Sequence, residues 1–134
     1  MRQFIHYVLA GCVLLSAVCG ANDAFTPKPA DVRVVIDISG SMKKTDPTNL
    51  RKPAVDLLVR LLPDESKAGI WTFGQSVNML VPHRLVDPQW RTEGASKANT
   101  ISSVALFTNI GGALEAATED HAVPSTDFQR NVIL

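Results

Sequence analysis

The chain runs Val32-Arg33-Val34-Val35-Ile36 and then Asp37-Ile38-Ser39-Gly40-Ser41, so that an apolar stretch leads directly into one carboxylate and two hydroxyl groups. A near-continuous apolar run is typical of a strand that is covered on both faces, and we expect such a strand over residues 32–38. Asp37, Ser39 and Ser41 occupy alternate positions of the loop that follows, where side chains can turn toward a common point. Mg²⁺ prefers hard oxygen ligands and keeps several positions for water or a partner. The pattern therefore predicts a divalent-cation site at the end of this strand. An ordinary turn, in which Asp and Ser side chains cap backbone N–H groups, is the alternative.

A second motif, Thr108-Asn109-Ile110-Gly111-Gly112-Ala113-Leu114-Glu115, has the pattern of a loop that enters a helix. Thr108 or Asn109 is the expected N-cap of a helix over residues 109–119. Within it, Ile110, Leu114 and Ala117 are spaced for one buried face. The Gly pair has neither of the spacings used for phosphate binding, so close packing of the helix is the better interpretation.

Together the two motifs resemble the von Willebrand factor A domain with its metal-ion-dependent adhesion site. The resemblance covers about residues 31–134, and it implies that Asp37, Ser39, Ser41 and Thr108 contact one Mg²⁺ or Mn²⁺ ion. In that family an Asp in a Thr-Asp-Gly turn after a later strand completes the site. A single direct carboxylate leaves a divalent ion with residual positive charge, so we expect an acidic residue of a protein partner to occupy an open position on the ion. The sequence ends before such a turn, so we expect residues 31–134 to be the N-terminal part of a truncated domain.

The expected fold class is α/β, with a Rossmann-like open and mostly parallel sheet, helices on both faces and one antiparallel edge strand. The connection between the second and third strands is too short for a crossover helix, which makes the third strand antiparallel. The family's strand order places the first strand beside the fourth, at a switch point where ligands bind. Asp46-Pro47 is the expected start of the first helical region, and Pro82 is expected to end the third strand. The remaining expected elements are a helix over residues 52–62, strands over 67–73 and 77–81, a helix over 87–102, and an apolar, buried strand from Arg130 onward.

The first 24 residues have the outline of a secretory signal peptide, followed by a short linker over residues 25–30. A positive start precedes a mostly apolar run, and small residues near Ala21 or Ala24 favour cleavage there. An uncleaved membrane anchor and a lipoprotein cleaved at Cys12 are the alternatives. Both cysteines, Cys12 and Cys19, lie in this leader, so the mature chain would have no disulfide. The protein is therefore expected to be exported to the periplasm or cell surface, with membrane contact only through the leader or a missing C-terminal region.

The charges are balanced, with 13 basic and 13 acidic residues. This balance, without a basic stripe, argues against nucleic acid as a partner. His83 and His121 have no acidic or Ser partner at a telling spacing and are expected at the surface, whereas Trp71 and Phe73 are expected in the core. Ser39 lacks the Gly-x-Ser-x-Gly turn and the base that a nucleophile requires.

Two function classes follow. The first is an exported, metal-dependent module that binds a protein partner through an acidic residue. The second is a structural or assembly domain in which the metal site is incomplete or unused. An enzyme such as a metal-assisted phosphohydrolase ranks third, because the second acid that it needs is replaced by Ser39. We therefore expect no enzymatic activity.

Overall fold

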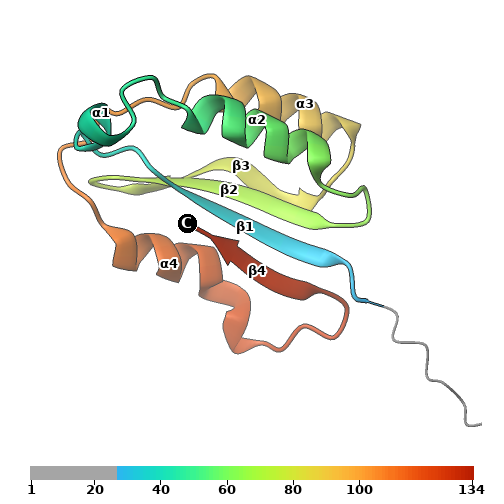
Figure 1. The fold of residues 1–134 in the computed structure, drawn as a ribbon. Helices are drawn as coiled ribbons and strands as arrows, with labels where there is room; N and C mark the ends of the chain where they lie inside the picture. Colours follow the sequence, from blue (N-terminus) through green and yellow to red (C-terminus); the bar gives the residue numbers. More distant parts are fainter. Residues whose placement is uncertain (1–26) are drawn as a thin grey trace, which may run out of the picture.

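The computed structural model describes residues 27–134, so the predicted signal peptide over residues 1–24 and the beginning of the predicted linker lie outside the described residues. The described part forms one four-stranded sheet with helices on both faces (Figure 1). The strand order is β3-β2-β1-β4. The strands are β1 (Ala30–Asp37), β2 (Lys67–Phe73), β3 (Val77–Leu85) and β4 (Gln129–Ile133).

Strand β1 is central and pairs in parallel with β2 on one side and β4 on the other. Six consecutive residues of β1, from Asp31 to Ile36, are buried, as the apolar run predicts for a strand covered on both faces. Strand β3 pairs antiparallel with β2 and lies at the edge of the sheet. The predicted α/β fold class, the antiparallel edge strand and the neighbouring positions of the first and fourth strands are confirmed.

Helices α2 (Arg51–Leu61) and α3 (Pro88–Ala98) cover one face of the sheet, and α4 (Ile110–Thr118) covers the other (Figure 1). Two short elements, α1 (Met42–Thr45) and the 3-10 helix η1 (Glu119–Ala122), follow β1 and α4. Among the described residues, no helix has the length and apolar content needed to span a bilayer.

The two faces of the sheet have separate cores, because successive side chains of a strand point to opposite faces. The larger core lies under α2 and α3 and includes Val34, Val59, Ile70 and Trp90. The smaller core lies under α4 and consists of Val35, Trp71, Phe73, Ala113 and Ala117, which confirms the prediction that both aromatic residues are buried. Alanines on the inner side of α4 allow this helix to approach the sheet closely.

Strand β3 continues through Pro82 to Leu85, so the prediction that this proline ends the strand is wrong. Pro82 lies in an edge strand, at a shift in the register of the β2–β3 pairing. A proline has no backbone N–H to donate, and such a position tolerates this loss because the regular pairing is interrupted there. Its carbonyl oxygen also accepts a hydrogen bond of 2.9 Å from the indole N–H of buried Trp90. The edge strand is therefore held to α3 at the residue that was expected to end it.

The helix boundaries differ from the sequence prediction in two places. Asp46 does not start a helix at Pro47; its carboxylate instead accepts hydrogen bonds from the backbone N–H groups of Leu50 and Arg51, where α2 begins. Helix α3 begins as predicted, with Asp87 as N-cap, but ends at Ala98 rather than near residue 102. At both helices the start is determined by a side chain that binds nearby backbone groups, Asp46 for α2 and Asp87 for α3.

The buried face of α4 also differs from the prediction. Ala113 and Ala117 are buried, whereas Ile110 and Leu114 are exposed. Likewise β4, which was predicted to be a buried strand, has exposed Val132 and Ile133. In the described part of the chain β4 pairs only with β1, so it lies at the second edge of the sheet and is incompletely covered.

Candidate metal centre

The loop after β1 brings the first three predicted ligands together. The backbone N–H of Ser39 donates a hydrogen bond of 2.6 Å to Oδ1 of Asp37, which forms a tight turn. The Oγ atoms of Ser39 and Ser41 are 2.8 Å apart. Ser39 is only 2% exposed, while Ser41 is exposed and Asp37 is half-buried. The carboxylate and both hydroxyls thus lie within one turn at the carboxyl end of the central strand. This turn contains both the capping bond from Ser39 to Asp37, as in an ordinary turn, and the pair of Ser39 and Ser41 hydroxyls.

A second loop packs against this turn through its backbone. Ala105, in the connection between α3 and α4, forms a parallel bridge with Ser39. Its carbonyl oxygen accepts a hydrogen bond of 2.6 Å from the N–H of Gly40, and its N–H donates one of 3.1 Å to the oxygen of Ile38. Residues 103–109 are therefore attached to the turn after β1 by paired hydrogen bonds on both sides of Ser39.

Thr108 is brought to the same end of the sheet, but it is joined to the other candidate ligands only through neighbouring residues. Asn109, the next residue, donates its backbone N–H to the oxygen of Gly74 at 3.0 Å, and Gly74 follows the residue of β2 that pairs with Asp37. Thr108 itself is exposed, and within residues 27–134 no hydrogen bond joins its side chain to the other three candidate ligands. Asn109, not Thr108, caps α4, through a bond of 3.0 Å from the N–H of Gly112 to its side chain. The Thr108 hydroxyl is thus left free of a capping role.

Arg51 is a positioning residue that the sequence did not reveal. Its guanidinium donates to the backbone oxygen of Asp37, to Oδ2 of Asp46 at 2.8 Å and to Oγ of Ser103 at 2.7 Å. One largely buried cation therefore connects the end of β1, the start of α2 and the loop that carries Thr108. These partners are 5 to 52 residues away in sequence, so no local motif could have indicated them.

The described residues contain no group of three or more His, Cys, Asp or Glu side chains placed to hold a metal ion. Any cation at the end of β1 would therefore depend on hydroxyl oxygens in addition to Asp37. Such a ligand set suits a hard ion that retains bound water, rather than a soft ion held by thiolates or imidazoles.

The close contact of the two loops at Gly74 leads to a stability prediction. A Cβ added at Gly74 would lie 2.1 Å from Cβ of Ala105, so Gly74→Ala must displace the loop that carries Thr108. We expect the free energy of unfolding to fall by about 1–3 kcal/mol, as for other overpacked sites. Urea unfolding measures this change. Gly111→Ala is the matched control, because nothing lies within 4 Å of its added Cβ and a small gain is expected there. Equal stability of the two variants would show that the close packing of Gly74 against Ala105 does not constrain the fold.

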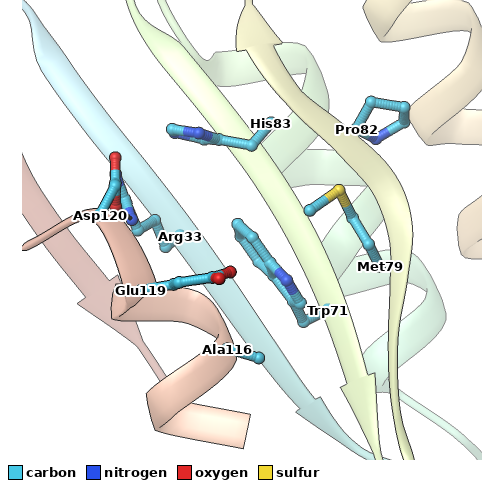
Figure 2. Close-up of a pocket in the computed structure, with 8 residues that line it drawn as sticks. All are labelled: Arg33, Trp71, Met79, Pro82, His83, Ala116, Glu119 and Asp120. Carbon is cyan, nitrogen blue, oxygen red and sulfur yellow. Dashed lines mark hydrogen bonds and ion pairs between the residues drawn. The ribbon is translucent and has the colours of Figure 1, made fainter.

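A cavity of about 570 Å³ lies elsewhere, between α4, η1 and strands β2 and β3 (Figure 2). Arg33 lies in its wall, with a side chain that is only 2% exposed. Its guanidinium donates to Asp31 at 2.8 Å, to both carboxylate oxygens of Asp120, and to the backbone oxygen of Ala117 at 2.6 Å. The positive charge of Arg33 is therefore compensated by Asp31 and Asp120, which gives this cluster a structural role.

His83 belongs to this cluster, so the expectation that it lacks an acidic partner is wrong. Its Nε2 is 2.7 Å from Oδ1 of Asp31, although the two residues are 52 positions apart. The ring also lies beside Trp71, with centroids 5.9 Å apart. The antiparallel pairing of β3 with β2 produces this contact, and a sequence-spacing argument cannot detect it.

The cluster predicts loss of stability in acid. The hydrogen bond from Arg33 holds the pKa of Asp120 well below its usual range. Burial alone would raise the pKa of Asp31, but hydrogen bonds from Arg33 and His83 lower it overall. A carboxyl group with a lowered folded-state pKa stabilises the fold above its unfolded pKa of about 3.9, and this stabilisation is lost as the pH falls below that value. We expect the melting temperature, followed by circular dichroism, to fall between about pH 5 and 3, and to fall less steeply in Asp120→Asn. Identical pH profiles would contradict the role of this carboxylate.

Comparison with protein-family models and with curated proteins gives no match. Solved structures do match. A von Willebrand factor type A protein from Catenulispora acidiphila has a TM-score of 0.66 and 20% identity over 78% of this chain. The mussel byssus protein called proximal thread matrix protein 1, in a structure with a zinc-occupied MIDAS motif, has a TM-score of 0.62 and 22% identity over 81% of this chain. The von Willebrand factor domain of the type V pili tip protein Mfa5 from Porphyromonas gingivalis has a TM-score of 0.64 and 19% identity, also over 81%.

This chain spans 25%, 31% and 38% of the length of those three solved chains. The same matches cover 78–81% of this chain. The described part of the chain therefore has the fold of a von Willebrand factor type A domain.

Proposed function

We propose that this protein is a metal-dependent module for binding other proteins, with one Mg²⁺ or Mn²⁺ ion held at the end of β1. Asp37, Ser39, Ser41 and Thr108 would hold the ion. The observation that carries the proposal is the pairing of the Ser39 and Ser41 hydroxyl oxygens, 2.8 Å apart, beside the only carboxylate of the turn.

The spacing of the hydroxyl oxygens supports an octahedral ion. Two adjacent ligands of Mg²⁺, each about 2.0–2.1 Å from the ion and at a right angle, are about 2.9 Å apart. The Oγ atoms of Ser39 and Ser41 are already 2.8 Å apart. Asp37 uses Oδ1 for the N–H of Ser39, which leaves its second oxygen for an ion. The same 2.8 Å separation is that of an ordinary hydroxyl–hydroxyl hydrogen bond, and it is compatible with a small hard cation bound by both oxygens.

The charge of this ligand set determines the kind of partner. One carboxylate and three neutral hydroxyls leave a divalent ion with an uncompensated positive charge, so a Glu or Asp side chain from another protein can fill an open position and neutralise it. Binding of this kind needs no general base and no nucleophile. An interaction role without enzymatic activity therefore fits the site better than hydrolysis.

The similar solved structures support an interaction role. One is a thread matrix protein whose MIDAS motif holds zinc, and another is a pili tip protein. Both descriptions are compatible with a module that acts outside the cytoplasm. We accordingly propose export to the periplasm or cell surface, in agreement with the leader predicted from the sequence.

The alternative is a structural or assembly domain that does not use the metal. The position of Thr108 favours this alternative, because its side chain is not hydrogen-bonded to the other three candidate ligands within the described residues. The capping bond from Ser39 to Asp37 would also exist in an ordinary turn. Only a metal measurement separates the two functions.

Titration calorimetry of the full chain with Mg²⁺ and with Mn²⁺ is that measurement. The proposal expects saturable binding of one ion, and a melting temperature that rises with ion concentration because the ion binds the folded state. Absence of saturable binding for both ions would reject the metal-dependent function and favour the structural alternative.

A further inference from the structure

Large apolar side chains are exposed next to the candidate metal centre. Leu106 is 83% exposed, Phe107 is 64% exposed and Ile110 is 43% exposed. We call these three residues the apolar rim. They flank Thr108, and because consecutive Cα atoms are about 3.8 Å apart, every rim residue has its Cα within about 7.6 Å of the Cα of Thr108. A molecule that contacts the Thr108 hydroxyl is therefore within reach of the rim.

The rim belongs to a loop that is held in place. The backbone of Ala105 is bonded to Ile38 and Gly40, and that of Asn109 is bonded to Gly74. Gly74 also packs beneath this loop, since a Cβ there would lie 3.4 Å from the oxygen of Phe107. Backbone groups on both sides of the rim are thus used for attachment, while its side chains remain in solvent. Three large apolar side chains exposed within five residues of the chain, beside a candidate ligand, form a candidate binding surface.

Positive charge also borders the candidate metal centre. Lys43 and Lys44 in α1 lie two and three residues after Ser41 and are exposed. No ion pair is found for either lysine within residues 27–134, whereas the neighbouring Asp46 is paired with Arg51 at 2.8 Å. The centre is therefore bordered by two free cations after Ser41 and by the apolar rim around Thr108.

We propose that the partner of this site is a protein segment in which the metal-binding Asp or Glu has a large apolar residue on one side and a second acidic residue on the other. This inference rests on the proposed function, because the metal holds the first carboxylate. The apolar residue would bury surface against Leu106 and Phe107, and the second acid would lie near Lys43 and Lys44. Aromatic side chains such as Phe107 are frequent among residues that dominate binding energy, and complementary charge favours the correct partner.

An array of capped nonapeptides tests the proposal. Each peptide has a central Asp, and its flanks combine Leu or Phe, Glu, Ser and Lys. The full chain is bound to the array in Mg²⁺ and in EDTA. We expect strongest binding to peptides that carry Leu or Phe on one side and Glu on the other, with loss of binding in EDTA. Replacement of the apolar flank by Ser should weaken binding on the order of tenfold.

Three variants assign the effect to residues. The double substitution Leu106→Ser and Phe107→Ser should remove the preference for an apolar flank, and Lys43→Ser with Lys44→Ser should remove the preference for Glu. Leu61→Ser is the control, because Leu61 is 69% exposed but lies at the end of α2. All three changes replace exposed side chains. Mg²⁺ affinity measured by calorimetry should equal that of the unchanged chain in the rim and control variants, and should not fall in the lysine variant, which removes positive charge near the ion.

The outcomes separate this inference from the proposed function. If Mg²⁺ binds but no peptide does, or if the flanks make no difference, the rim inference is wrong while the metal centre stands. If the rim variants keep the flank preference, the inference is equally overturned. If Mg²⁺ does not bind, or peptides bind equally well in EDTA, the metal-dependent function fails, and the proposed partner fails with it.

Discussion

Asp37→Asn is expected to abolish measurable Mg²⁺ binding. Asp37 is the one charged residue in the proposed ligand set, and loss of an outer partner of a metal ligand already lowers affinity by about 10–100-fold. Removal of a charged direct ligand should therefore lower the Mg²⁺ affinity further, by on the order of 100-fold or more. Titration calorimetry of the variant and the unchanged chain measures the difference.

The Asn replacement is chosen because it preserves the turn. Its side-chain oxygen can still accept the hydrogen bond from the N–H of Ser39, so the fold should be retained. Asp37→Ala should abolish metal binding as well, with an additional stability loss of about 1 kcal/mol for the missing hydrogen bond. Asp56→Ala is the control, since Asp56 pairs with Arg60 at the surface of α2. Equal metal affinity in Asp37→Asn and the unchanged chain would remove this residue from the proposed site.

Arg33→Met is expected to cause a large loss of stability, about 3–5 kcal/mol, as is typical when one partner of a buried ion pair is removed. The side chains of Arg33 and Asp31 are 2% and 4% exposed. The substitution would leave the Asp31 carboxylate buried with His83 as its remaining side-chain partner. Asp120 and the backbone oxygen of Ala117 would lose the same donor, which connects β1 to the end of α4.

Urea unfolding followed by the fluorescence of the two buried tryptophans measures this loss. Arg60→Met is the matched control, because Arg60 pairs with Asp56 at 2.8 Å but is exposed, and exposed ion pairs contribute little to stability. Asp31→Asn added to Arg33→Met should restore part of the stability, since it removes the unpaired buried charge. If Arg33→Met costs no more than Arg60→Met, the cluster does not stabilise the fold.

Strand β1 and strand β2 were predicted within two residues of their observed bounds, and the start of α4 within one residue. These elements have strong local signals: an apolar run in β1, the large apolar residues Ile70, Trp71 and Phe73 in β2, and a capping residue before α4. The prediction for β3 was wrong at Pro82, because the cost of a proline depends on whether its N–H would face a neighbouring strand. The predicted face of α4 was wrong because hydrophobic spacing cannot tell which side chains the sheet covers.

The candidate site was predictable to the extent that it is local. Asp37, Ser39 and Ser41 lie within five residues, so a single turn brings their oxygens together. Thr108 was placed by resemblance alone, and the structure attaches its loop through Ala105, Asn109 and Gly74. These attachments are made by backbone groups, so a side-chain motif could not have indicated them.

The sequence by itself determined the buried central strand, the turn of oxygen ligands after it, and the α/β character of the chain, because periodicity and capping act between near neighbours. Only the tertiary structure decided that Arg51 connects β1 to the loop before Thr108, that His83 meets Asp31, and that the apolar rim remains in solvent. The physical reason is that hydrogen bonds and burial at these residues depend on strand order and helix placement. The partners are distant along the chain and become neighbours only when the sheet has formed.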